Sequence, residues 1–106
     1  MDDRIIINSA EKFSENPANF YKLCLYITGM TPICRKAIEN IKTICDTHLL
    51  DNYELEIIDM YQDPLLAIED QIIASPTLVK KFPLPIKKLI GNLSDTGKIL
   101  KALDLA

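Results

Sequence analysis

The sequence of 106 residues predicts a single α/β domain with the element order strand, helix, strand, helix, strand, strand, helix. Three observations lead to this prediction. The length fits one domain of ordinary size. Two pairs of a capping residue and a proline, Thr31-Pro32 and Asp63-Pro64, each come soon after an apolar, β-branched run. Two short apolar runs near the C-terminus are separated by a proline-rich break, which is typical of a hairpin.

The first strand is predicted over Tyr21–Thr28, because this run is aliphatic and aromatic and ends at Gly29. Both of its faces are mostly apolar, which places it in the middle of a covered sheet. Thr31 is a good helix N-cap, and Pro32 suits the first helical position. Apolar residues then recur at helical spacing to about His48, namely Cys34, Ala37, Ile38, Ile41, Ile44 and Cys45.

The second strand and the second helix are predicted from the next segment. Tyr53–Asp59 alternates apolar and polar residues over its first five positions, so one of its faces is expected to be wet. Asp63-Pro64 repeats the signature of a helix start. We expect the apolar face of this helix to consist of Leu65, Ile68, Ile72 and Ile73.

The C-terminal part predicts a hairpin and a last helix. Ser75–Val79 and Ile86–Ile90 are short strands on either side of Pro83–Pro85, and the helix is capped by Ser94 or Asp95. Its apolar residues are Ile99, Leu100, Leu103 and Leu105. The strand-helix-strand opening implies a right-handed parallel crossover. With helices on both faces of a four-stranded sheet, this is the thioredoxin architecture.

The composition and the N-terminal sequence exclude several functional classes. A net charge of −3, from 12 basic and 15 acidic residues, argues against a duplex nucleic-acid binder. The single His argues against a His-built metal site, and we expect no cofactor. The sequence has neither a secretory signal nor the run of about 20 apolar residues that a membrane span needs. We therefore expect a cytoplasmic protein with reduced thiols.

Residues 1–19 are mainly polar, and we interpret them as an N-terminal arm, mobile or lying along a partner, before a domain at residues 20–106. Three apolar residues, Ile5–Ile7, leave a short edge strand as the alternative.

Cys34 is the candidate for thiol chemistry, because thioredoxin folds place their active cysteines where the first strand meets the first helix. It matches the resolving cysteine of a C-x-x-C motif, but Thr31 occupies the attacking position, so the usual dithiol cycle is not expected. The first helical turn would lower the pKa of Cys34, whereas burial would raise it. We interpret Cys34 as structural, with a sensory thiol as the alternative. Cys24 and Cys45 are expected to be core residues.

The remaining polar candidates give no good enzyme site. Pro76 is a cis-proline candidate, since thioredoxin-like proteins place one there. Four lysines flank the hairpin turn and either form a basic partner site or protect an edge strand: Lys80, Lys81, Lys87 and Lys88. Capping or solvation explains the others, which are His48, Asp63, Glu69 and Asp70.

Several segments resemble the bacterial KaiB family. They are Leu25–Pro32, Ile58-Asp59, Asp63–Ala67, Ile72–Lys80, Pro83–Ser94 and Leu103–Leu105. The likeness runs from about residue 20 to residue 106, and the hairpin with the following Gly-x-Leu-Ser turn, Gly91–Ser94, is its most specific part.

The resemblance implies a non-catalytic regulator related to thioredoxin. KaiB proteins dock on the N-terminal ATPase ring of KaiC and displace a KaiB-like domain of a sensor histidine kinase. The family is also metamorphic. One form is thioredoxin-like. The other re-forms the C-terminal half, here about residues 60–106, as two helices and a strand, which gives the whole domain the order β-α-β-β-α-α-β, and it assembles into tetramers. A dimer or tetramer is therefore expected.

The KaiC-facing positions agree only in part with the cyanobacterial pattern. Lys36, Lys80 and Lys88 keep the positive charge, and we add Lys87 as a candidate partner-binding residue. Glu56, also a candidate, and Gln71 stand where cyanobacterial members carry lysine. Reversing a charge against a fixed interface opposes binding to a cyanobacterial-type KaiC.

Three positions are candidates for controlling the fold switch: Gly91, Ala102 and Asp104. Cyanobacterial members carry glycine at the position of Ala102. Alanine is favoured over glycine in a helix by about 0.8–1 kcal/mol, which changes a two-state population about fivefold. We therefore predict that this chain favours the thioredoxin-like form more than its cyanobacterial relatives do.

The sequence thus predicts a KaiB-like adaptor that regulates a KaiC-type ATPase, in clock-like or stress-response signalling. Two alternatives remain at this point. One is a thiol-based redox protein that uses Cys34, and the other is a homo-oligomeric module of a histidine-kinase pathway.

Overall fold

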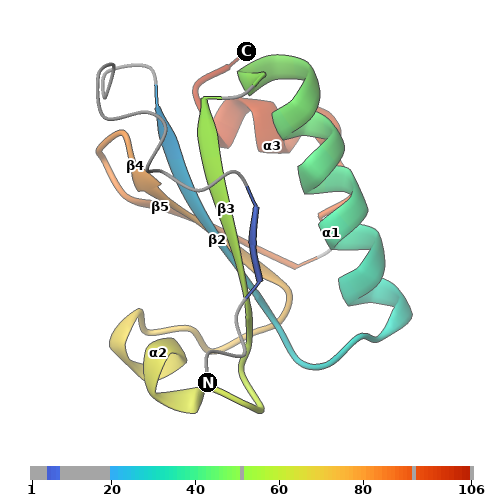
Figure 1. The fold of residues 1–106 in the computed structure, drawn as a ribbon, viewed down its shortest axis with the longest axis vertical. Helices are drawn as coiled ribbons and strands as arrows, with labels where there is room; N and C mark the ends of the chain where they lie inside the picture. The colour runs from blue at the N-terminus through green and yellow to red at the C-terminus, as the bar shows by residue number, and fades with distance from the viewer. Residues whose placement is uncertain (1–4, 8–19, 51, 92, 106) are drawn as a thin grey trace.

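The computed structural model describes residues 5–7, 20–50, 52–91 and 93–105. Its strands are β1 (Ile5–Ile7), β2 (Tyr21–Ile27), β3 (Tyr53–Asp59), β4 (Thr77–Phe82) and β5 (Lys87–Ile90). Its helices are α1 (Pro32–Ile44), which continues as a π-helical turn (Cys45–Leu49), α2 (Pro64–Glu69) and α3 (Thr96–Ala102). Figure 1 shows their arrangement.

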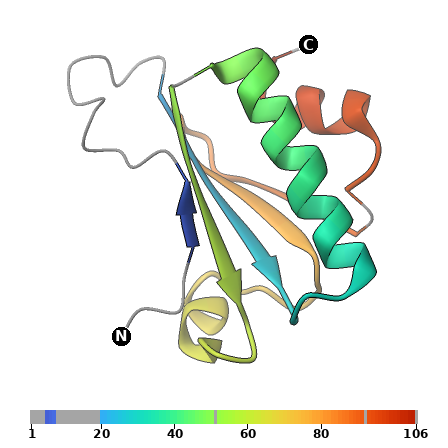
Figure 2. The same ribbon diagram turned by 45° about the vertical axis from the view of Figure 1, so that its right-hand side comes forward.

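The sheet confirms the thioredoxin-like topology and adds one strand to it. The strand order is β1-β3-β2-β4-β5, with β2 and β3 parallel and the other neighbours antiparallel. The fifth strand is Ile5–Ile7, which pairs with β3 at one edge (Figure 2). This part of the predicted arm therefore adopts the alternative, an edge strand. The rest of the arm, residues 1–4 and 8–19, lies outside the described residues.

Helices cover both faces of the sheet, as predicted. α1 and α3 lie side by side over one face (Figures 1 and 2). The core between them and the sheet includes Leu23, Leu25, Ile41, Leu55, Leu78 and Ile99. On the other face, α2 packs Ala67 against a smaller cluster of Cys24, Tyr26, Ile58 and Val79.

The helix starts follow their local signals closely. Thr31 caps α1, and its hydroxyl oxygen accepts a hydrogen bond from the Cys34 N–H at 3.2 Å. For α3 the cap is Asp95, one of the two predicted candidates, which accepts from the Lys98 N–H. Asp63 holds the capping position of α2, but its side chain makes no capping hydrogen bond.

The predicted apolar face of α2 is wrong. Leu65 and Ile68 are each 69% exposed and Ile73 is 92% exposed, whereas Ala67 is buried. The physical reason is the length of the helix, which has six residues and ends at Glu69. Ile72 and Ile73 therefore lie beyond it and do not continue its face.

The C-terminal half has the thioredoxin-like arrangement, with α2, β4, β5 and α3 in that order. The alternative KaiB form would require a strand at residues 101–105. Here Ala102 is instead the last residue of a helix, so this segment does not form that strand.

Candidate partner-binding site

The thioredoxin-type site lies where β2 leads into α1. Ser75-Pro76 is a cis peptide bond. The Thr28 hydroxyl donates to Ser75 Oγ at 3.1 Å, and Cys34 Sγ is hydrogen-bonded to the same oxygen at 3.6 Å. A second thiol is absent here because Thr31 holds the corresponding position and uses its hydroxyl as a helix cap.

The three thiols differ in their electrostatic surroundings. Burial raises the pKa of Cys34, but hydrogen bonds with Thr31, Thr28 and Ser75 outweigh it and leave the pKa below its ordinary value. Burial raises the pKa of Cys24 and of Cys45 to about 12. All three cysteines are free and buried.

The four hairpin lysines do not converge into one basic patch, which corrects one of the two sequence interpretations. Lys80 and Lys81 are consecutive in β4, so the pleat directs their side chains to opposite faces of the sheet. Lys87 is the register partner of Lys80, and Lys88 that of Val79. Lys80 and Lys87 therefore share the face of α3, and Lys81 and Lys88 share the face of α2.

Asp104 forms ion pairs with the two lysines on the α3 side of the sheet. Lys80 Nζ and Lys87 Nζ each lie 3.1 Å from one of its carboxylate oxygens. Lys80 is only 1% exposed, whereas the Asp104 side chain is 55% exposed. Asp104 has a left-handed backbone, φ 60°, directly after the end of α3. Lys80 is therefore an internal ion-pair partner and not, as predicted, a residue that faces a binding partner.

Asp70 binds the polar side chains on the α2 side of the sheet. It caps the C-terminal end of α2, and its carboxylate accepts from the Tyr26 hydroxyl and lies 2.8 Å from Lys81 Nζ. Lys88 donates to its backbone carbonyl oxygen. We call Asp70 and Asp104 the two aspartate anchors, because each ties the end of a helix to the β4–β5 hairpin.

Both aspartate anchors have a lowered pKa. For Asp70, burial raises the pKa, but hydrogen bonds from Lys81 and Tyr26 outweigh it. For Asp104, hydrogen bonds from Lys80 and Lys87 hold the pKa below its ordinary value of 3.8. Because the folded-state values lie below the unfolded ones, each carboxylate contributes stability that is complete above about pH 4 and is lost at lower pH.

The other predicted partner-binding residues lie in separate places. Lys36 is exposed on α1, beside a surface pocket of about 380 Å³ that Pro32, Ile33 and Ser94 also line. Lys88 is exposed on β5. Glu56 is buried and accepts a hydrogen bond from Cys24 Sγ at 3.7 Å, so its charge does not face solvent.

Sequence reasoning missed an exposed apolar surface around the hairpin and α2. Leu84 is 71% and Ile86 59% exposed, in addition to Leu65 and Ile68 on α2. The short proline-bounded loop between two strands was the available signal for Leu84, since it leaves little room to turn that side chain inward.

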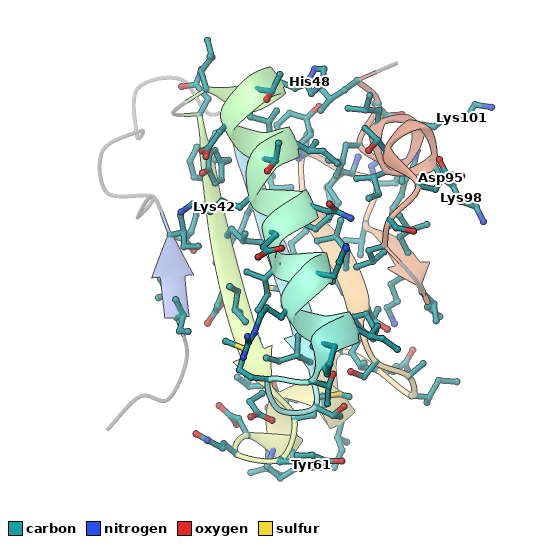
Figure 3. All side chains as sticks on the ribbon, turned by 90° about the vertical axis from the view of Figure 1, so that its right-hand side faces the viewer. Lys42, His48, Tyr61, Asp95, Lys98 and Lys101 are labelled. Atoms are coloured by element: carbon teal, nitrogen blue, oxygen red, sulfur yellow. The ribbon has the colours of Figure 1, made fainter. Side chains whose placement is uncertain are left out.

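Figure 3 shows Lys98 and Lys101 pointing away from the domain, on the helix face opposite the core.

The described residues hold no metal-binding group of three or more His, Cys, Asp or Glu side chains. Among the same residues, no helix combines the length and the apolar character that crossing a membrane requires.

Comparisons with known proteins show which family this chain belongs to. A family model described as the KaiB domain matches residues 24–105. The chain belongs to the KaiB family. The circadian clock oscillator protein KaiB of Synechococcus elongatus is 43% identical over 90 residues, which cover 85% of this chain and 88% of that protein. The KaiB of a Picosynechococcus species is 47% identical over 85 residues, or 80% of this chain and 82% of that protein.

Solved structures support the fold independently. The N-terminal domain of Synechococcus elongatus SasA superposes with a TM-score of 0.67 at 21% identity, covering 82% of this chain and 86% of that domain. Mitochondrial thioredoxin 3 from Saccharomyces cerevisiae gives a TM-score of 0.66 at 18% identity, covering 84% of this chain and 82% of that protein. KaiB is a non-catalytic clock protein, so family membership agrees with the prediction that this chain is not an enzyme.

Proposed function

We propose that this protein is a regulatory adaptor that docks on a KaiC-type ATPase, in clock-like or stress-response signalling. The observation that carries the proposal is the match to the KaiB family over residues 24–105, with relatives named as circadian clock oscillator proteins. The lack of a second thiol beside Cys34 supports a binding role over a redox role.

The docking surface that we propose combines charge with exposed apolar side chains. Lys88 supplies a positive charge on β5, and Leu84 and Ile86 lie exposed in the adjoining loop. Lys36 on α1 lies over the other face of the sheet, and we propose it as a second contact, separate from that surface. Lys80 and Glu56 are left out of this surface because both are buried. An interface of this kind gains its specificity and association rate from charge and its affinity from apolar contacts.

The test is complex formation with the KaiC-type ATPase of the same genome, followed by size-exclusion chromatography in ATP and in ADP. We expect a complex in at least one nucleotide state and about tenfold weaker binding by Lys36→Glu and Lys88→Glu. Lys98→Glu is the matched control, since Lys98 is an exposed lysine on α3, outside the proposed surface. Absence of a complex in both nucleotides, or equal losses in all three variants, would refute the proposal.

We further propose that the thioredoxin-like form is the resting form of this chain and that Ala102 supports it. Ala102 is the last helical residue of α3, and glycine there costs at most the about 0.8–1 kcal/mol that it costs in a helix interior. Ala102→Gly should therefore increase any tetrameric, fold-switched population, by up to about fivefold, measured by sedimentation velocity. Lys101→Ala serves as the control, because it keeps a strong helix former in the same turn. An unchanged tetramer fraction in Ala102→Gly would contradict this role.

A further inference from the structure

The two edges of the sheet are protected differently. β5 carries Lys87 and Lys88, and lysines on an edge strand discourage pairing with another chain. At the other edge lies β1, which consists of three isoleucines and has no charged side chain. Figure 2 shows β1 beside β3 and running in the opposite direction.

β1 is held to the domain by a small number of contacts. It pairs through Ile5 with Ile57, through Ile6 with Glu56 and through Ile7 with Leu55. Ile5 is 48% and Ile6 47% exposed, and Ile7 packs at the border of the core. Three half-buried residues gain little from burial relative to the conformational entropy that ordering them removes.

The outer edge of β3, on which β1 lies, does not depend on β1 for its position. β3 has seven residues, and Leu55 and Ile57 are anchored in the core by α1 and β2. β1 also lies before residues 24–105, the segment that matches the KaiB family. The β3 edge is therefore a binding site for an extended, apolar, antiparallel segment, and this chain carries such a segment at its own N-terminus.

We propose that the outer edge of β3 exchanges its occupant between β1 of the same chain and β1 of a second copy. A second copy supplies the same three isoleucines and so reproduces the observed register without any new contact. Reciprocal exchange gives a closed twofold dimer. This dimer is independent of docking on an ATPase and needs no change of fold in the C-terminal half.

The test places one new cysteine on each of two differently tagged full-length chains. Ile5→Cys in one chain and Ile57→Cys in the other occupy register partners, so an oxidant can link these two thiols between chains when β1 of one copy lies on β3 of the other. We expect a disulfide-linked heterodimer that increases with protein concentration. Ile5→Cys mixed with Ile90→Cys, on the opposite edge, is the control and should give no disulfide-linked heterodimer. No heterodimer, or an equal yield in the control, would overturn the proposal.

Two substitutions of opposite charge at residue 6 test the register, because Ile6 lies opposite Glu56. Added to the Ile5→Cys chain, Ile6→Asp places two carboxylates opposite each other and should abolish the crosslink. Ile6→Lys removes the same apolar side chain but faces Glu56 with the opposite charge, so the crosslink should persist. Equal yields from the Asp and Lys variants would refute the register.

A second measurement covers the case in which Ile57→Cys does not fold. A fluorescein-labelled peptide of residues 1–10 is the probe, and fluorescence anisotropy is the readout. The full-length Ile6→Asp chain, whose own β1 is released, should bind the peptide about tenfold more tightly than the unmodified chain. The same affinity for both chains, or no binding to either, would count against an exchangeable edge.

Discussion

Tyr26→Ala is expected to destabilise the domain by about 3–5 kcal/mol, the usual cost of truncating a large buried aromatic side chain. Tyr26 is 1% exposed and lies in the small cluster beneath α2. Its hydroxyl also donates to the Asp70 carboxylate, so the same side chain supplies both the packing and a hydrogen bond that hold α2 to the sheet. Total stabilities of about 5–15 kcal/mol mean that this single change leaves a marginal protein.

Tyr26→Phe separates the two contributions, since it keeps the ring and removes the hydroxyl. We expect a loss of about 1–2 kcal/mol, because Asp70 retains Lys81 as its partner. Urea unfolding followed by far-ultraviolet circular dichroism measures both variants. Equal losses from Phe and Ala would mean that the hydrogen bond, and not the packing of the ring, holds α2 to the sheet, which would contradict the expected difference.

Asp104→Asn is the second substitution for which we expect a large effect. Asparagine tolerates the left-handed backbone at this position, so the change removes little besides the charge. The Lys80 ammonium would then stay buried without its carboxylate, which is strongly unfavourable. The urea midpoint should fall well below that of Lys87→Met, because Lys87 is 38% exposed and remains solvated.

A rescue experiment makes this expectation specific. When both partners of a buried ion pair are replaced by uncharged residues of similar size, stability is often retained. Lys80→Met combined with Asp104→Asn should therefore recover most of the stability that Asp104→Asn alone loses. A double variant no more stable than the single one would show that Lys80 is not the reason for the loss.

The parts of the fold that were predictable from the sequence are those that local signals determine. Thr31, Pro32 and Asp95 act within a few residues of themselves, so the starts of α1 and α3 could be read directly. The end of α2 could not, because Gln71 adopts a left-handed backbone, φ 58°, without being glycine. Contacts from Tyr26 and Lys81, both distant in sequence, hold Asp70 at that end.

The candidate site shows the same division between local and distant information. The opposite directions of Lys80 and Lys81 follow from strand geometry and were within reach of sequence reasoning. Their partners were not, since Asp104 and Asp70 reach the hairpin only through the packing of two different helices. β1 was only an alternative in the sequence because three apolar residues are a weak signal and its partner, β3, lies about 50 residues away.

The placement of the two aspartate anchors has a consequence for how the domain opens. Both bind lysines of one hairpin, although α2 and α3 lie on opposite faces of the sheet. Each aspartate binds one lysine of β4 and one of β5, so separation of these two strands would break a contact at both helix ends at once. Amide protons of α2, β5 and α3 should then exchange with solvent as one cooperative unit, slower than those of β1 and sooner than those of β2 and β3.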